Sequence, residues 1–350
     1  MSGSVGLPAN PRVAVVGATG VVGRVMLGLL EERSFPASEV IAVASARSAG
    51  RKIPFAGGEL TVKPLEASVF QGVDLVVMDT PDEIARQWAP VAAAAGAIVV
   101  DNSAAWRMDD NVPLVCPEVN TAALAGAVKG IVASPNCTTL GVVVPLGALH
   151  QRFGLEKVVV SSYQSVSGAG AIGIDELREQ VEKLASQPGA IEGLGSGAGL
   201  DLYPPARAFP APIAFNAVPR AGSPRPAGYT SEEVKLDTET RKIMGLPNLQ
   251  VTATCVRVPT IVGHGASVWA RFTSPVDVDG ATEALAAAPG VEVVDLPTPL
   301  ASAGRDPSMV GRIRPDLNDN HALCFFCACD NLRKGAALNA VQIAEALLPR

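Results

Sequence analysis

Short apolar runs alternate with segments of helical periodicity through the first third of the chain. The runs fall at residues 12–16, 40–44, 73–78 and 97–100. After the first run, apolar residues from Val22 to Leu30 recur with the spacing i, i+3, i+4, i+7, i+8, which predicts one apolar face of a helix. Strands that alternate with helices predict a parallel, doubly wound sheet of the α/β class.

Two more helices are indicated by composition and spacing. The alanine-rich segment 82–96 lies between the third and fourth apolar runs and predicts a helix. Thr80 is its candidate N-cap, and Pro81 suits its first turn. A terminal helix is indicated over 333–348, where the apolar positions include Leu338 and Val341.

Beyond about residue 135 the pattern changes to longer, alternating strands at 158–166, 251–258 and 266–272. Between the first two of these strands, residues 187–228 are dense in glycine and proline. This stretch is too long for an ordinary loop inside a compact domain. We interpret it as an ordered excursion rather than a disordered linker, because its apolar side chains need burial, within the chain or against a partner subunit. These side chains are Leu202, Tyr203, Phe209, Ile213, Phe215 and Val218.

Composition limits the class of protein. With 350 residues, 48% of them hydrophobic, the chain has material for two well-buried domains. A net charge of −6 and a pI near 5.2 argue against a nucleic-acid partner, which requires a concentrated basic face. No run of about 18 apolar residues predicts a membrane span, and residues 1–12 lack the layout of a signal peptide. We therefore expect a cytoplasmic protein with no membrane partner.

The six cysteines are expected to be reduced thiols, as is usual in a cytosolic enzyme. They stand at positions 116, 137, 255, 324, 327 and 329. The spacing Cys324-x-x-Cys327-x-Cys329, with His321 just upstream, is compatible with a metal site. However, 322–329 is an almost unbroken apolar run of strand length, in which cysteine behaves as a small hydrophobe. We therefore expect a strand here and no metal.

A glycine-rich turn follows the first apolar run and precedes the first helix. Its spacing is Gly17-x-x-Gly20-x-x-Gly23. Such a turn lets the backbone approach a phosphate, and the helix N-terminus offers free N–H groups to it. A purely structural tight turn is the alternative, but the position between a strand and an amphipathic helix favours a nucleotide site.

The end of the next strand indicates which cofactor binds. An NAD enzyme usually has a carboxylate there for the ribose 2′-hydroxyl, whereas this chain has Ser45, Arg47 and Ser48, with Arg51 and Lys52 close behind. Two hydroxyls and a guanidinium suit a 2′-phosphate. The sequence therefore favours NADP over NAD.

Cys137 is the candidate nucleophile. It follows Ser134-Pro-Asn136 at the predicted start of a helix through Leu149, where the helix dipole is expected to lower the pKa of the thiol. Asn136 and neighbouring backbone N–H groups could support a developing oxyanion. A buried structural cysteine is the alternative reading.

The chain has three histidines, His150, His264 and His321, so few side chains can carry a proton near neutral pH. His264 stands between Gly263 and Gly265, immediately before an alternating strand. Flanking glycines would allow close approach to a substrate, which favours a catalytic role over that of an ordinary loop histidine.

Several short blocks occur in a characteristic order along nearly the whole chain. They are Gly17-Ala-Thr-Gly-Val-Val-Gly23, Asp101-Asn-Ser103, Pro135-Asn-Cys137-Thr-Thr139, Ser162-Tyr-Gln164-Ser-Val-Ser-Gly-Ala-Gly170, Ile213-Ala-Phe-Asn216, Cys255-Val-Arg257-Val-Pro259, Gly263-His264 and Asp330-Asn-Leu-Arg-Lys-Gly-Ala-Ala-Leu-Asn339. In this combination the chain resembles the aspartate-semialdehyde dehydrogenases of the bacterial type.

The resemblance implies a role for each of these residues. Cys137 would be the thioester-forming nucleophile, His264 the acid–base residue, and Gln164 a residue that orients the substrate. Substrate contacts would come from Arg257 on the α-carboxylate, Glu232 on the α-ammonium, and Arg107, Asn136 and Lys235 on the phosphate. Cofactor contacts would come from Gly17, Thr19, Gly20, Val21, Val22, Ser45, Arg47, Ser48, Ser167, Gly168 and Asn331.

The resemblance also implies a fold and an activity. We expect a Rossmann-type NADP-binding domain, 1–135, completed by the terminal segment 331–350. Residues 136–330 would form an α+β catalytic and dimerisation domain with a mixed sheet. The implied reaction is the NADPH-dependent reductive dephosphorylation of L-aspartyl-4-phosphate to L-aspartate-4-semialdehyde, which releases inorganic phosphate. It serves lysine (diaminopimelate), methionine and threonine biosynthesis, and we expect a homodimer.

Three departures from the family pattern leave alternatives open. The chain has Asp79-Thr-Pro-Asp-Glu83 where the family usually has Ser-Ala-Gly, and this acidic loop could weaken cofactor binding. Ser134 stands where asparagine is common, and Ser165 replaces a usual alanine.

An N-acetyl-γ-glutamyl-phosphate reductase shares the fold and chemistry but needs no partner for a free ammonium. A catalytically silent paralogue that acts as a binding or assembly subunit is the alternative from another class.

Overall fold

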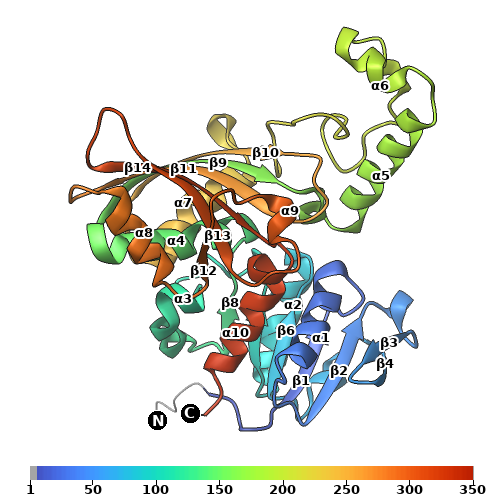
Figure 1. Cartoon of the computed structure of the whole chain (residues 1–350). Coiled ribbons are helices and arrows are strands. Elements are labelled where there is room, and N and C mark those ends of the chain that lie inside the picture. Colours follow the sequence, from blue (N-terminus) through green and yellow to red (C-terminus); the bar gives the residue numbers. More distant parts are fainter. Residues whose placement is uncertain (1–5, 350) are drawn as a thin grey trace.

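The computed structural model describes residues 6–349 and contains two six-stranded sheets, one above the other in Figure 1. The first sheet is wholly parallel, with the strand order β5-β2-β1-β6-β7-β8. Its strands are β1 (Arg12–Val16), β2 (Glu39–Ala44), β5 (Lys63–Pro64), β6 (Leu75–Met78), β7 (Ile98–Asp101) and β8 (Ile131–Ala133). The doubly wound sheet predicted from the apolar runs is therefore confirmed.

Helices cover both faces of the parallel sheet because successive side chains of each buried strand point to opposite sides. One face packs against α1 (Val21–Glu32) and α10 (Leu338–Ala346), which follows a π-helical turn at Arg333–Ala337. The other face packs against α2 (Asp82–Ala94) and α4 (Cys137–Phe153). A separate hairpin joins β3 (Lys52–Phe55) to β4 (Gly58–Thr61).

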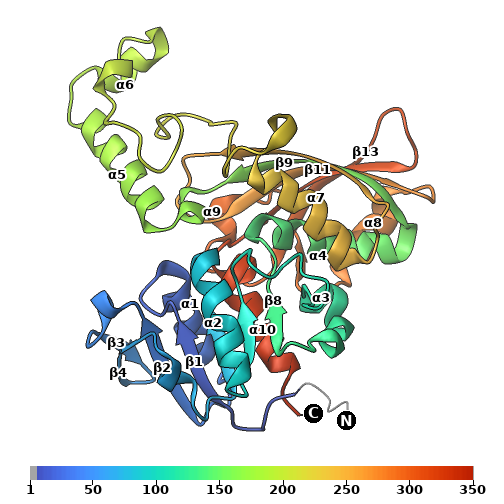
Figure 2. The same cartoon turned by 180° about the vertical axis from the view of Figure 1, so that it is seen from behind.

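The predicted start of α2 needs one correction. Pro81, not Thr80, is the N-cap, and the Thr80 hydroxyl makes no hydrogen bond within residues 6–349. The ring of Pro81 disfavours a helical conformation in the preceding residue, so Thr80 lies outside the helix. The terminal helix forms as predicted and packs on the first sheet, as Figures 1 and 2 show. The domain limits stay predictions, and residues 1–5 and 350 lie outside the described part.

The second sheet is mixed, as expected, with the strand order β10-β9-β11-β14-β13-β12. Its strands are β9 (Leu155–Gln164), β10 (Gln250–Arg257), β11 (His264–Phe272), β12 (Val291–Val293), β13 (Ser308–Pro315) and β14 (Ala322–Cys329). The pairs β9–β10 and β12–β13 are parallel, whereas the other pairs are antiparallel. The cysteine-containing run 322–329 is thus a strand, as predicted.

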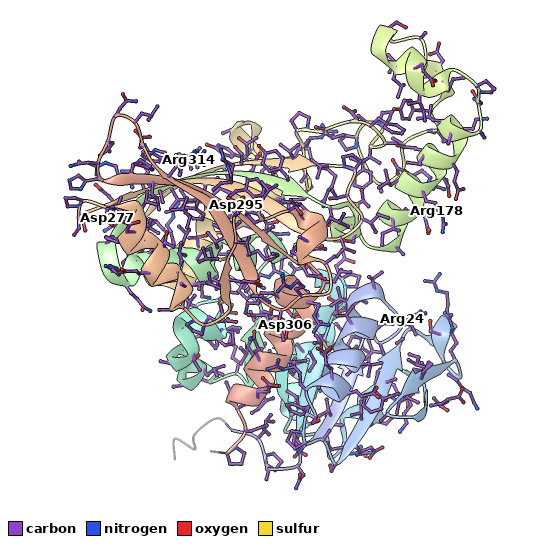
Figure 3. All side chains as sticks on the ribbon, viewed as in Figure 1. Arg24, Arg178, Asp277, Asp295, Asp306 and Arg314 are labelled. Atoms are coloured by element: carbon purple, nitrogen blue, oxygen red, sulfur yellow. The ribbon has the colours of Figure 1, made fainter. Side chains whose placement is uncertain are left out.

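The two faces of the mixed sheet differ in what covers them. One face packs on α4, α7 (Ser231–Met244) and α8 (Val278–Ala286), and the short helices α3 (Pro117–Asn120) and α9 (Pro299–Ser302) lie nearby (Figure 1). On the opposite face Val159 and Tyr163 are exposed, and the Tyr163 ring stacks on Phe326 with centroids 5.8 Å apart. Charged side chains such as Arg24, Arg178 and Arg314 lie at the periphery (Figure 3).

The glycine- and proline-rich stretch 187–228 is ordered, as predicted. It follows α5 (Ala171–Ala185) and begins with α6 (Ala190–Gly193), and both helices project from the rest of the chain (Figures 1 and 2). Phe209, Ile213 and Val218 join a small hydrophobic cluster with α5. Phe215 is 54% exposed, so its expected burial is not provided within this chain. Within residues 6–349 no helix has the length and apolar composition needed to cross a membrane.

Candidate active site

Cys137 is the first residue of α4, directly after the carboxyl end of β8. Asn136 caps this helix, since its side-chain oxygen accepts hydrogen bonds from the backbone N–H groups of Thr138 at 3.0 Å and Thr139 at 3.3 Å. The cap holds the thiol at the edge where ligands of parallel sheets bind. Cys137 Sγ lies 3.3 Å from His264 Nε2, so the structure brings the two predicted catalytic side chains together.

The surroundings of His264 determine which ring nitrogen carries the proton. Nδ1 lies 3.1 Å from the backbone N–H of Ser165, which can only donate, so Nδ1 accepts. The hydrogen of the neutral ring is therefore on Nε2, the nitrogen that faces Cys137. His264 is 3% exposed, and burial, followed by the charge of Arg257, lowers its pKa to about 3. His264 is thus a neutral hydrogen-bond donor toward the sulfur.

A second group of buried polar side chains lies behind the imidazole. The Ser165 hydroxyl lies 3.1 Å from His264 Nδ1 and donates to Asn331 Oδ1 at 3.0 Å. Asn331 Nδ2 donates to the Ser167 hydroxyl at 2.9 Å, and Asn331 Oδ1 also accepts from the Gly263 N–H at 2.9 Å. These contacts fix the loop after β9 and the loop after β14 on either side of the histidine.

The pKa of Cys137 is raised in the free protein, not lowered as its place at a helix N-terminus predicts. Burial, followed by the negative charge of Glu232, raises the pKa of this thiol, while Arg257, Lys235 and Arg107 act in the opposite direction. The buried carboxylate therefore opposes formation of the thiolate. A positive group bound to Glu232 would remove that opposition.

Arg257, the last residue of β10, is a buried guanidinium with free hydrogen-bonding capacity. It is 6% exposed, Nη1 donates to the Ser165 carbonyl at 2.7 Å, and Nε has no partner among residues 6–349. Burial lowers its pKa, although the nearby Glu232 acts against this. A buried cation that lacks a bonded carboxylate is costly, so this position suits an anionic ligand.

Glu232 lies in the first turn of α7, which begins with a capping box between Thr230 and Glu233. Its two carboxylate oxygens accept hydrogen bonds from Lys235 Nζ at 2.8 Å and from Asn136 Nδ2 at 2.9 Å. Burial would raise the pKa of Glu232, but Lys235 and then Asn136 hold it below its ordinary value. Glu232 is therefore ionised at neutral pH.

Arg107 is held in place by contacts with three parts of the protein. Its guanidinium donates to Glu239 at 3.0 Å, to the Ser134 carbonyl at 2.9 Å and to the Asn102 carbonyl at 2.6 Å. Glu239 also accepts from the Asn136 N–H at 2.7 Å. Sequence reasoning missed Glu239, although its spacing of seven from Glu232 predicts that the two share one face of a helix.

Most of these side chains line one cleft of about 440 Å³ between the two sheets, but His264, Glu239 and Ser165 are not among its lining residues. Of the predicted site residues it contains Val22, Arg107, Asn136, Cys137, Gln164, Ser167, Gly168, Glu232, Lys235, Arg257 and Asn331. Side chains without a predicted role also line it, among them Asn102, Phe209 and Arg220. Gln164, at the end of β9, is buried and donates to the Ser162 hydroxyl at 3.2 Å.

The glycine-rich turn lies at the carboxyl end of β1 and is tightly folded. A Cβ at Gly23 would lie 2.2 Å from the Gly17 carbonyl oxygen, and Gly17 has a φ of 92°. The first N–H groups of a helix have no intrahelical partner, and no side chain among residues 6–349 caps those of α1. The predicted residues Gly17, Thr19, Gly20, Val21, Ser45, Arg47 and Ser48 lie here and at the end of β2, outside the residues that line the cleft.

Asp79 stands where the cleft meets the glycine-rich turn. It follows β6, its carbonyl oxygen abuts Gly17, and its side chain lines the cleft together with Val22. Burial, together with the charge of Asp101, raises the pKa of Asp79 to about 6, although hydrogen bonding and Arg107 act in the opposite direction. The unusual acidic loop therefore places an ionisable carboxyl beside the glycine-rich turn.

Two family models together match most of the chain. The model described as "Semialdehyde dehydrogenase, NAD binding domain" matches residues 12–127, and "Semialdehyde dehydrogenase, dimerisation domain" matches residues 146–334. The chain belongs to the semialdehyde dehydrogenase family. The resemblance inferred from the ordered motifs is thereby confirmed.

Individual members of the semialdehyde dehydrogenase family agree along nearly the full length. The chain is 49% identical to the aspartate-semialdehyde dehydrogenase of Corynebacterium glutamicum over 96% of this chain and 99% of that one. It is 44% identical to the enzyme of that name from Aquifex aeolicus over 96% and 98% of the two chains. The fold matches aspartate semialdehyde dehydrogenase II of Vibrio cholerae complexed with ASA, with a TM-score of 0.90, 39% identity and coverage of 97% and 98%.

Proposed function

We propose that the protein catalyses the NADPH-dependent reductive dephosphorylation of L-aspartyl-4-phosphate to L-aspartate-4-semialdehyde. One observation carries the proposal. Cys137 lines the same cleft as an under-bonded Arg257 and an ionised Glu232, and its sulfur lies 3.3 Å from His264 Nε2. An α-amino acid presents a carboxylate and an ammonium on one carbon, and Arg257 and Glu232 offer a partner of opposite charge to each.

The phosphate group of the substrate would be bound by Lys235 and Arg107, with the Asn136 amide beside them. Lys235 already contacts Glu232, and its ammonium lines the cleft. Arg107 is buried and held by Glu239, so its charge is fixed in position before the substrate arrives. Fixed charges of this kind lose little entropy when they bind an anion.

Once the substrate ammonium has bound Glu232, the Cys137 thiol would lose its proton to solvent, and the thiolate Sγ would attack the acyl carbon of the substrate. A C–S bond forms as the bond to the phosphate oxygen breaks, and phosphate leaves. His264 Nε2–H would donate to the sulfur and then to the oxyanion of the tetrahedral species, with no need for a second proton on the ring. Bound NADPH supplies the hydride that reduces the thioester carbonyl carbon. Cleavage of the C–S bond then releases the aldehyde and regenerates the thiolate.

The residues at the ends of β1 and β2 fit a phosphorylated dinucleotide. The uncapped start of α1 suits the diphosphate, because its N–H groups are free and the helix dipole is positive there. Ser45 and Arg47 are exposed at the end of β2, where a 2′-phosphate of NADP would lie. Ser167, Gly168 and Asn331 would border the nicotinamide side.

Asp79 is expected to make cofactor binding depend on pH. As the pH rises through about 6, this carboxyl ionises, and its negative charge should then oppose the cofactor phosphates. In D79N the affinity for NADP at pH 8 should rise about fivefold, while affinity at pH 5 should stay close to that of the native protein. Fluorescence titration with NADPH at both pH values measures this. An equal gain at both pH values would contradict a role for ionisation.

Glu232 is expected to keep the Cys137 thiol protonated until an ammonium group binds to the carboxylate. In E232Q the largest charge that raises the pKa of Cys137 is removed, so iodoacetamide should alkylate Cys137 about three to ten times faster at pH 7. The KM for the semialdehyde should rise in the same variant. Peptide mass spectrometry quantifies the labelling, with the exposed Glu182→Gln as a matched control. An unchanged labelling rate would contradict an effect of Glu232 on the pKa of Cys137.

We also propose a homodimer, formed through the second domain. The uncovered face of the mixed sheet carries exposed Val159 and Tyr163, with Phe326 stacked on the tyrosine. A sheet face with exposed apolar and aromatic side chains is typical of a subunit interface. A cytoplasmic location stays a prediction from the sequence.

The test of the proposed function is the phosphate-dependent reduction of NADP by purified protein with L-aspartate semialdehyde. N-acetylglutamate semialdehyde and NAD are run in parallel. Turnover with the first aldehyde and NADP alone would support substrate, cofactor and phosphate site together. Turnover with the acetylated aldehyde would favour the N-acetyl-γ-glutamyl-phosphate reductase alternative. No turnover by folded protein with either aldehyde would favour the silent paralogue.

A further inference from the structure

The excursion 187–228 has no role in the proposed reaction, yet part of it forms a wall of the cleft. Ala208, Phe209 and Pro210 line the cleft together with Arg257 and Cys137. The segment lies far from these residues in sequence, and it reaches them after the chain has passed through the projecting helices α5 and α6 (Figure 1). We call residues 207–214 the wall loop.

Two buried polar side chains on one face of α5 hold both ends of the wall loop. Glu176 Oε2 accepts hydrogen bonds from the backbone N–H groups of Arg207 at 2.8 Å and of Ala208 at 2.5 Å. Gln180 Oε1 accepts from the N–H groups of Ile213 at 2.8 Å and Ala214 at 2.9 Å. The two acceptors lie four residues apart on the helix, and Gln180 Nε2 donates to Glu176 Oε1 at 3.2 Å.

The burial of Glu176 indicates that its hydrogen bonds to the wall loop stabilise the structure. The side chain is 2% exposed, and a buried carboxylate is tolerated only where hydrogen bonds compensate for lost water. Here the compensation comes from backbone N–H groups of the wall loop. The helix α5 therefore fixes the backbone on both sides of Phe209 rather than merely covering it.

Phe209 connects this anchored loop to the substrate site. Its ring is buried, and the centroid lies 5.8 Å from the guanidinium carbon of Arg257. A guanidinium over an aromatic face gains cation–π attraction while its N–H edges stay free for a carboxylate. On the backbone side the space is also closed, because a Cβ at Gly168 would lie 2.7 Å from Arg257 Nη1. Arg257 is thus confined by the ring and by the glycine backbone.

We propose that Phe209, held by Glu176 and Gln180, is a positioning and specificity-determining residue for an α-amino acid substrate. It orients Arg257 for the α-carboxylate, and its ring, which lines the cleft beside Arg257, would hinder a substrate enlarged by an acyl group on the neighbouring amine. This rests on the proposed function, because it takes Arg257 as the carboxylate partner. The excursion thereby becomes the part of the chain that selects free-amine over N-acylated substrates.

Steady-state kinetics of F209A test the proposal. With NADP and phosphate, the KM for L-aspartate semialdehyde should rise about 5- to 30-fold, the range that loss of a cation–π contact predicts. The KM for phosphate should stay within about twofold, because phosphate binds elsewhere in the cleft. Relative kcat/KM for the N-acetyl derivative of the same semialdehyde should increase at least about fivefold.

Variants of Glu176 separate positioning from general stability. E176A should shift the semialdehyde KM in the same direction as F209A, whereas E176Q, which keeps an oxygen acceptor for the two N–H groups, should lie closer to the native protein. The exposed Glu182→Ala on the same helix is the matched control and should match the native protein. F209L keeps apolar volume without the aromatic face. If F209A does not fold, the semialdehyde KM of F209L tests the role of the ring instead.

Two results would overturn the inference. One is a semialdehyde KM within about twofold of native in F209A or F209L and in E176A. The other is an equal rise in the KM for phosphate and semialdehyde. If the native protein does not turn over the semialdehyde at all, the proposed function fails instead. If the native protein is active and the variants have unchanged KM values, only the role of the wall loop is contradicted, and the proposed function stands.

Discussion

Replacing Cys137 by serine should reduce phosphate-dependent turnover by about four orders of magnitude or more, while NADP binding stays unchanged. The sulfur lies 3.3 Å from His264 Nε2 at the start of α4, in position to form the proposed thioester. A serine hydroxyl is not ionised at neutral pH, and His264 already carries its hydrogen on the nitrogen that faces it, so the ring cannot act as a base there.

Rapid-mixing measurement of NADPH formation and isothermal titration with NADP check the two halves of this prediction. Cys324→Ser is the matched control, since Cys324 lies half-buried on β14 and outside the cleft, and it should keep native turnover. Full activity in the Cys137 variant would end the thioester assignment.

Replacing Arg257 by lysine is expected to lower kcat/KM for the semialdehyde about 30- to 150-fold, the loss that corresponds to one charge-assisted pair. The KM should rise because the ammonium of lysine cannot bind a carboxylate with two parallel hydrogen bonds. The kcat should also fall, because Arg257 Nη1 donates to the Ser165 carbonyl, and the N–H of the same Ser165 donates to His264 Nδ1.

Arg220→Lys is the matched control for the Arg257 variant. Arg220 also lines the cleft but is exposed, so a lysine there should leave kcat/KM within about twofold of native. Steady-state kinetics with varied semialdehyde at saturating phosphate measure both variants. An unchanged kcat/KM in R257K would show that the α-carboxylate of the substrate does not bind to Arg257.

Local patterns correctly predicted that Cys137 starts a helix and that His264 starts a strand. Cys137 could be placed at a helix start from the apolar run before it, and His264 at a strand start from its flanking glycines. Both expectations concern the ends of secondary-structure elements, and in α/β proteins such ends gather at one edge of the sheet. The contact between the two side chains follows from that arrangement.

Features that depend on tertiary contacts could not be predicted. Glu239 has its role because Arg107 and the Asn136 N–H come from distant segments. The direction of the pKa shift of Cys137 depends on burial and on Glu232, which outweigh the effect expected from the helix N-terminus. Phe209 lies in a stretch without periodicity, so no local signal marked it as part of the cleft.

The terminal helix has a consequence for how the protein forms during synthesis. Leu338, Val341 and Ile343 belong to the same core as Val13 and Val15, and the Leu7 N–H bonds to the Leu347 carbonyl at 2.8 Å. The last part of this core is therefore synthesised only after every strand of the second sheet. Until then, one face of the amino-terminal sheet is incompletely covered. We therefore expect chaperones to bind the nascent chain.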